Sequence, residues 1–233
     1  MAALAALAAL AMGSGLPVDG WPIARATVAG TRTPTVVVFG DSLTVGIHYG
    51  ATRRDPYASV LAARLGASGR VVNAGIGGNA LGIVVPRWTN GAPGVQRFGV
   101  DALAVPGVRV VIVFEGINDV MSGGSVAEVV GALRRIVAQA HARRVRVILA
   151  TLTPYDRCYR YTQRGEAMRE TINRWIRTAG VADGEIDFDA IMRDAHDPRR
   201  LNPRYDSGDG IHPTAAGYAH MADVIPLSLV RPS

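Results

Sequence analysis

The chain of 233 residues contains no lysine, so all 25 of its basic residues are arginines. The formal net charge of +6 raises the question of a nucleic acid or another anionic partner. The arginines are scattered, however, no run of them exceeds two, and 19 acidic residues lie among them. This pattern lacks the basic stripe of a nucleic-acid-binding surface, and a coding preference for arginine accounts for it. We therefore expect no nucleic-acid partner.

Cysteine is nearly absent. Cys158 is the single one, which excludes an intrachain disulfide and any metal site built from several cysteines. Cys158 could act as a nucleophile only beside a suitable base, and a passive, packed cysteine is the alternative.

No apolar stretch reaches the roughly 18–20 residues of a membrane span, so we expect no stable membrane insertion. Residues 2–12 (AALAALAALAM) resemble the apolar part of a secretory signal peptide, and Ala9-Leu10-Ala11 offers a small-x-small cleavage pattern. The basic residues that normally precede such a segment are missing, since the first arginine is Arg25. We expect an exported protein, secreted or held in the cell envelope. The alternative is a cytoplasmic protein that begins with an Ala/Leu helix.

The sequence divides into residues 1–34, a leader and linker, and residues 35–233, one domain. In the domain, short β-branched runs alternate with helical stretches. The predicted strands span 35–39, 70–73, 109–115, 145–150 and 185–188, and the predicted helices span 56–65, 94–104, 125–143 and 163–179, with a last helix after Pro213. Continuous apolar strands are typical of parallel sheets buried on both faces. The alternation predicts a doubly wound α/β fold.

Loops at the carboxyl ends of parallel strands are where ligands bind, so chemistry is expected there. Ser42 follows the first strand within Gly-Asp-Ser-Leu-Thr. Its exposed hydroxyl can attack a bound carbonyl. The alternative is a serine that caps a helix.

A glycine-rich loop, Asn73–Ala80, follows the second strand, and its glycines let backbone N–H groups approach a ligand. The spacing Gly75-x-Gly77-x-x-Ala80 also fits a dinucleotide fingerprint, which expects an acidic residue about 20 positions later. The nearest fit is Glu115, about 40 positions on, so a nucleotide site is disfavoured.

Two further loops carry polar groups. Asn118, in Gly-Ile-Asn-Asp, can donate its side-chain N–H to a developing oxyanion, or it can stabilise its own loop through an Asx turn. His212, in Asp-Gly-Ile-His-Pro, is a candidate general base. Asp209 lies three residues earlier and can orient the ring, leaving the other nitrogen for Ser42. Structural roles for both residues are the alternative.

Together these blocks resemble the SGNH hydrolase superfamily, also called the GDSL lipase/esterase family. The matching segments are Gly40–Leu43, Gly78 within Gly-Ile-Gly-Gly, Gly116–Asp119 and Asp209–His212. They occur in the family's order, and the resemblance covers residues 35–225. It implies a flavodoxin-like three-layer α/β/α sandwich around a five-stranded parallel sheet.

The resemblance also implies site roles. Ser42 would be the nucleophile, His212 the general base and Asp209 its orienting carboxylate. The N–H groups of Ser42 and Gly78 and the side chain of Asn118 would form the oxyanion hole. No metal or organic cofactor is implied.

The expected activity is hydrolysis of carboxylic esters, with small acyl or acetyl esters, glycan esters or lipids as substrate classes. The alternatives are an acyltransferase that uses the same triad and a non-catalytic glycan-binding module. The oligomeric state is not encoded in any pattern of the sequence.

Substrate contacts are expected from loops at the same edge. The long loop Thr151–Gly165 carries Arg157, Arg160 and Arg164, and it forms either a pocket wall for polar or anionic substrates or a solvated surface loop. Trp88, from loop 82–94, is a further candidate for lining the pocket, with packing in the core as the alternative. His48, close behind Ser42, is another candidate.

Overall fold

The sheet at the centre of the fold contains five strands in the order β2-β1-β3-β4-β5. They belong to a computed structural model that describes residues 33–47, 57–82 and 89–231. The strands are β1 (Thr35–Gly40), β2 (Arg70–Gly75), β3 (Val108–Phe114), β4 (Arg146–Ala150) and β5 (Gly184–Ile186). All neighbouring pairs are parallel, and this is the flavodoxin-like strand order. The predicted fold class is confirmed.

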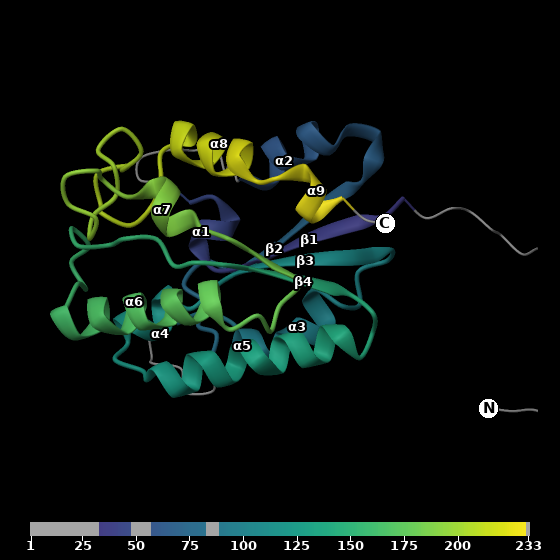
Figure 1. Ribbon diagram of the computed structural model, residues 1–233, viewed down its shortest axis with the longest axis horizontal. Coiled ribbons are helices and arrows are strands. Elements are labelled where there is room, and N and C mark those ends of the chain that lie inside the picture. The colour runs from purple at the N-terminus through teal and green to yellow at the C-terminus, as the bar shows by residue number, and fades with distance from the viewer. Residues whose placement is uncertain (1–32, 48–56, 83–88, 232–233) are drawn as a thin grey trace, which may run out of the picture. The chain divides into compact units, whose positions relative to one another are not determined.

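Helices cover both faces of the sheet (Figure 1). One face carries α2 (Tyr57–Leu65), α7 (Phe188–Met192), α8 (Ala215–Val224) and α9 (Leu227–Val230). The other face carries α3 (Gly94–Asp101), α4 (Ile117–Met121), α5 (Val126–His141) and α6 (Gln163–Thr178). The short helix α1 (Ser42–Val45) follows β1 directly and contacts β2, and a single 3-10 turn, Gly66–Ser68, follows α2. Two helical layers therefore enclose the sheet.

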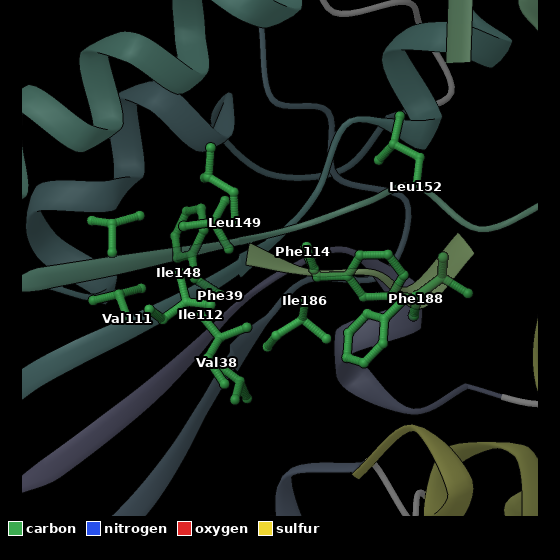
Figure 2. Packing of buried hydrophobic residues seen from close by; sticks show 14 of the residues in the cluster. Val38, Phe39, Val111, Ile112, Phe114, Ile148, Leu149, Leu152, Ile186 and Phe188 are labelled. Carbon is green, nitrogen blue, oxygen red and sulfur yellow. The ribbon is translucent and has the colours of Figure 1, made fainter. Parts of the chain in front are cut away.

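The core is continuous across the central strands, because β1 is buried along its whole length and β3 along nearly all of it. Aromatic rings pack near the carboxyl ends of the strands. Phe114 meets Phe188 edge-on with ring centroids 5.0 Å apart (Figure 2). Phe39 meets Phe98 of α3 in the same manner at 5.2 Å. This packing holds firmly the strand ends from which the functional loops leave.

The predicted strands match the observed strands to within two residues at each end. At β5 the predicted end, residue 188, differs from the observed end, Ile186, for a local reason. Asp187 then caps α7 by accepting a hydrogen bond from the N–H of Ala190 at 3.1 Å. Phe188, predicted as the end of the strand, is therefore the first residue of a helix.

Some sequence predictions fall outside the described residues. They concern the leader within residues 1–32 and the side chains of His48 and Trp88. Among the helices that the structure describes, none is both long and apolar enough to cross a membrane.

Candidate active site

Ser42 lies at the first position of α1, immediately beyond β1. The turn is tight at Gly40, where a Cβ atom would collide with the carbonyl oxygen of Phe114 on the neighbouring strand. The side chain of Asp41 caps the helix by accepting a hydrogen bond from the N–H of Leu43 at 2.9 Å. The capping role that was the alternative for Ser42 therefore belongs to Asp41.

Ser42, His212 and Asp209 form one chain of hydrogen bonds. His212 Nε2 lies 2.8 Å from the Ser42 hydroxyl, and His212 Nδ1 lies 2.6 Å from Asp209 Oδ2. A carboxylate can only accept, so the proton between Asp209 and the ring belongs to Nδ1. Nε2 is then left as the acceptor for the serine hydroxyl proton. The structure thus brings together three residues that lie up to 170 positions apart in sequence.

The loop that carries Asp209 and His212 is shaped by its own hydrogen bonds. Asp206 Oδ1 accepts from the N–H groups of Gly208 at 2.9 Å and of Gly210 at 3.0 Å. Gly210 has a φ of 77°, and a Cβ atom there would collide with the backbone at the junction of Arg157 and Cys158. Two loops therefore pack backbone to backbone, and only glycine permits that approach.

Asp209 remains ionised because hydrogen bonds favour its charged form. Burial alone would raise the pKa of Asp209, but hydrogen bonds from the ring and the backbone N–H of His212 outweigh it. The resulting pKa is about 2. An ionised Asp209 orients the imidazole and stabilises the imidazolium that forms when His212 takes a proton.

Asn118 and Gly78 face the same space as Ser42. The Nδ2 atom of Asn118 donates to the carbonyl oxygen of Asn79 at 2.7 Å, which ties two neighbouring loops together. An amide carries two N–H donors, so a second one remains for a ligand. Gly78 has a φ of 73°, a conformation that favours glycine. The N–H of Ser42 is in the first turn of a helix and has no partner within that helix.

The space between these groups is a half-open cavity of about 270 Å³. Its lining combines the polar groups above with apolar side chains from three loops and from the end of α4. The lining residues are Ser42, Ile47, Gly78, Asn118, Met121, Cys158, Tyr159, Arg160, Asp209, Ile211 and His212. All residues predicted for the triad and the oxyanion hole are thus brought to one cavity.

The prediction of residues that contact substrate agrees only in part with the lining of the cavity. Arg157 is exposed and is not among the described residues that line the cavity. Tyr159 and Arg160, from the same loop, do line it. The loop was therefore correctly placed at the site. Which of its side chains face the cavity could not be predicted from sequence, because an irregular loop has no periodicity.

Cys158 lies in the cavity wall with its sulfur 3.8 Å from the sulfur of Met121. Burial raises the pKa of the Cys158 thiol. A protonated thiol beside a thioether is a poor nucleophile. The geometry supports the passive role.

The glycines of the loop after β2 serve packing. A Cβ atom at Gly75 would collide with the backbone N–H of Val45 in α1, and one at Gly77 would press on the side chain of Ile47. Close packing against the segment that follows Ser42 therefore accounts for these glycines. This arrangement disfavours the dinucleotide site further.

Comparisons with known proteins agree with this geometry. The model of the GDSL-like lipase/acylhydrolase family matches residues 38–220. An aryl esterase from M. smegmatis shares 18% identity and a TM-score of 0.69, covering 86% of this chain and 100% of its own. A carbohydrate acetylesterase from Sinorhizobium meliloti shares 18% identity and a TM-score of 0.67, covering 85% of this chain and 99% of its own.

A lipolytic protein of the G-D-S-L family from Desulfitobacterium hafniense shares 22% identity and a TM-score of 0.63, covering 82% of this chain and 97% of its own. No protein of curated function matches the sequence significantly. The structural neighbours show the shared fold, and the family model covers most of the domain that holds the site. The chain therefore belongs to the GDSL-like lipase/acylhydrolase family and is a carboxylic-ester hydrolase.

Proposed function

We propose that this chain hydrolyses carboxylic esters of short acyl groups through an acyl-enzyme formed on Ser42. The observation that carries the proposal is the unbroken chain from Asp209 through His212 to Ser42, with distances of 2.6 and 2.8 Å, at the wall of a cavity. Nucleophile, base and orienting group are in hydrogen-bond reach of one another, as nucleophilic catalysis requires.

In the first half-reaction, Ser42 Oγ forms a bond to the ester carbonyl carbon while its proton passes to His212 Nε2. The π electrons of the carbonyl move to its oxygen, which becomes an oxyanion. The intermediate then collapses, the bond to the alcohol oxygen breaks, and His212 returns its proton to that oxygen. The alcohol leaves, and the acyl group remains on Ser42.

In the second half-reaction, a water molecule replaces the alcohol. His212 takes a proton from the water as the oxygen attacks the acyl carbon, and a second oxyanion forms. Its collapse breaks the bond to Ser42 Oγ, which regains the proton from His212. Both oxyanions are proposed to accept hydrogen bonds from the N–H groups of Ser42 and Gly78 and from Asn118 Nδ2.

The cavity favours a short acyl group and a polar alcohol. Its volume of about 270 Å³ is small for a long acyl chain, and its apolar wall includes Met121 and Ile211. Tyr159, 85% exposed, and Arg160 stand at its rim, where the alcohol part of an ester would lie. One structural neighbour is a carbohydrate acetylesterase and another an aryl esterase. We propose acetylated sugars as the substrate class.

The primary test is Ser42→Ala, assayed on chromogenic esters from acetyl to long acyl. We expect the variant to lose about 10⁴-fold or more in kcat/KM, because removing the nucleophile disables the whole triad. Ser125→Ala, which changes an exposed serine at the start of α5, is the control and keeps activity. Full activity in Ser42→Ala contradicts the triad, and a long-chain optimum contradicts the short-acyl proposal.

Transfer to an acceptor alcohol uses the same acyl-enzyme, so the products decide between hydrolysis and transfer. Wild-type enzyme incubated with an acetyl ester and excess free sugar is expected to release acetate. An acetylated sugar as the main product would make the chain an acyltransferase.

The loop after β4 is tested by comparing Arg160→Ala with Arg157→Ala. We expect Arg160→Ala to raise KM for polar esters, because Arg160 lines the cavity. Arg157→Ala is expected to leave KM unchanged, since Arg157 is not among the described residues that line the cavity. The reverse result, measured on neutral and anionic esters, would restore Arg157 as the substrate contact.

A further inference from the structure

Arg97 lies on α3, outside every motif that pointed to the site, yet it is 6% exposed. Besides Asp101 on the same helix, its guanidinium donates to three acceptors in other segments. Nη2 bonds the carbonyl oxygen of Gly40 at 2.8 Å, Nη1 that of Ala74 at 2.8 Å, and Nε the side-chain oxygen of Asn79 at 2.7 Å. These acceptors lie at the carboxyl ends of β1 and β2 and in the loop after β2. One planar, rigid group therefore fixes the separation of three backbone segments.

Each of those segments leads directly to a group of the oxyanion hole. Gly40 precedes Ser42 by two residues, and Asn79 follows Gly78 by one. The carbonyl oxygen of Asn79 also accepts the hydrogen bond from Asn118 Nδ2 at 2.7 Å. Ser42 and Gly78 thus lie within two residues of a group that Arg97 binds. Asn118 is connected to Asn79, which Arg97 also binds, by one hydrogen bond.

Asn79 is itself held in one orientation. It is 1% exposed, and its Nδ2 donates to the carbonyl oxygens of Asn90 at 2.6 Å and of Ala92 at 2.9 Å. Its Oδ1 accepts from Arg97. Both donors and the acceptor of the amide are occupied, so a flip of the amide would break all three bonds. The backbone carbonyl that orients Asn118 is therefore fixed as well.

The end of the third strand, β3, also lies close to Arg97. Glu115, the first residue after β3, has Oε1 3.5 Å from Arg97 Nη2, which is an ion-pair distance and long for a hydrogen bond. Asp101 lies 3.2 Å from Nη1, and the Phe39 ring lies 3.9 Å below the guanidinium carbon. Glu115, Asp101 and the Phe39 ring therefore all contact the guanidinium of Arg97, and together they fix its orientation.

From this arrangement we infer that Arg97, acting through Asn79, is a positioning residue that sets the geometry of the oxyanion hole. The inference rests on the proposed function, because it assigns Arg97 to the oxyanion that Ser42 would generate. Donor geometry matters most in the transition state, where the charge develops, so misplacement lowers kcat more than it raises KM.

The test compares Arg97→Lys with a matched control, Arg169→Lys. Lysine keeps the charge at both sites but cannot reproduce the planar fork. Arg169 is 3% exposed and bonds two carboxylates and the carbonyl oxygen of Leu152, away from the cavity. Both variants are expected to lower Tm. Only Arg97→Lys is expected to lower kcat on p-nitrophenyl acetate, by about 10- to 100-fold with KM within about threefold, as for a displaced catalytic group.

A second readout isolates the oxyanion. An alkylboronic acid adds to the serine hydroxyl and carries a negative charge where the oxyanion would form. We expect its inhibition constant to rise in Arg97→Lys in proportion to the loss of kcat/KM, and to stay unchanged in Arg169→Lys. If Arg97 had a purely structural role, Arg97→Lys would lower Tm, and the inhibition constant would not rise in proportion to the loss of kcat/KM.

Asn79→Asp provides an independent variant, which decides the question if Arg97→Lys does not fold. It keeps an oxygen for Arg97 but has no N–H for Asn90 and Ala92. We expect a lower kcat with little change in KM. Equal kcat values for Arg97→Lys and Arg169→Lys, or an unchanged kcat in Asn79→Asp, would overturn the inference. Ser42→Ala in the same assay tests the proposed function separately, because its activity does not depend on what Arg97 does.

Discussion

Two buried arginines, Arg97 and Arg169, look alike in burial and differ in what they bind. Arg97 donates mainly to neutral oxygens at strand ends that surround the cavity. Arg169 binds Glu166 through two hydrogen bonds of 2.6 and 2.9 Å and Asp189 through one of 2.6 Å, and it joins α6 to α7. Charge pairing thus dominates beyond the carboxyl ends of β4 and β5, while bonds to backbone oxygens dominate at the carboxyl ends of β1 and β2.

This difference separates stability from catalysis within one domain. Arg169 and Asp189 line a second cavity that shares no lining residue with the proposed site. Changes there should act on folding and leave turnover intact. Changes around Arg97 should act on turnover as well, because its partners carry the proposed oxyanion donors.

The largest effect on stability is expected from Arg169→Ala. The variant leaves Glu166 buried without its partner, and breaking a buried ion pair in this way costs about 3–5 kcal/mol. Urea unfolding measures the loss, and kcat per folded molecule is expected to stay within about twofold of wild type, since the change is remote from the site. A fall in kcat that exceeds the unfolded fraction would break the separation of the two regions.

Asn118→Ala is expected to give the converse result. Loss of one oxyanion donor lowers kcat by about 10²–10³-fold, equivalent to about 3–4 kcal/mol in the transition state. The control is Asn173→Ala, since Asn173 is fully buried and bonds both the N–H and the carbonyl oxygen of Leu152. That control is expected to lower Tm and preserve kcat. An Asn118→Ala enzyme with full turnover would remove Asn118 from the oxyanion hole.

Glu115→Gln is expected to change the pH dependence of stability. Burial raises the pKa of Glu115 to about 8, although Arg97 lowers it in part. Neither carboxylate oxygen has a hydrogen-bond partner among the described residues. Between the unfolded value, 4.5, and about 8, the folded chain binds one proton more than the unfolded chain. Stability therefore falls as pH rises, by about 1.4 kcal/mol per pH unit for one proton.

In Glu115→Gln this part of the slope is absent. Asp41, whose pKa burial raises to about 7, takes up a second proton on folding, so its share of the slope remains. Urea unfolding at several pH values between 5 and 8 measures the difference. Identical slopes in the variant and the wild type would show that Glu115 is ionised in the folded chain throughout that range.

The fold and the motif residues could be predicted because both are local in sequence. The central strands β1, β3 and β4 are largely apolar runs, and Ser42, Asn118 and His212 each lie in a short block next to a strand or helix end. Parallel topology then brings the strand ends together without further information. The end of β5 was missed because the side chain of Asp187 caps α7, so that Phe188 begins a helix and does not continue the strand.

The part of the site that sequence did not predict depends on contacts between distant segments. From sequence alone, Arg97 is expected to face solvent on an amphipathic helix. Its acceptors Gly40 and Asn79 lie 57 and 18 positions away along the chain. One signal was present: Arg97 directly precedes Phe98, whose ring is fully buried. Burial of a charge between such neighbours cannot be inferred without the acceptors that satisfy it.

The backbone contact between Gly210 and the junction of Arg157 and Cys158 has a consequence for how this enzyme can diversify. The segment that carries His212 packs against the segment that leads to Tyr159 and Arg160 at the rim of the cavity. Replacing the side chains of Tyr159 or Arg160 leaves this backbone contact unchanged, whereas inserting or deleting a residue before them would displace it. On the proposed function, substrate range would therefore change by point substitution at Tyr159 and Arg160 and not by changes of loop length just ahead of them.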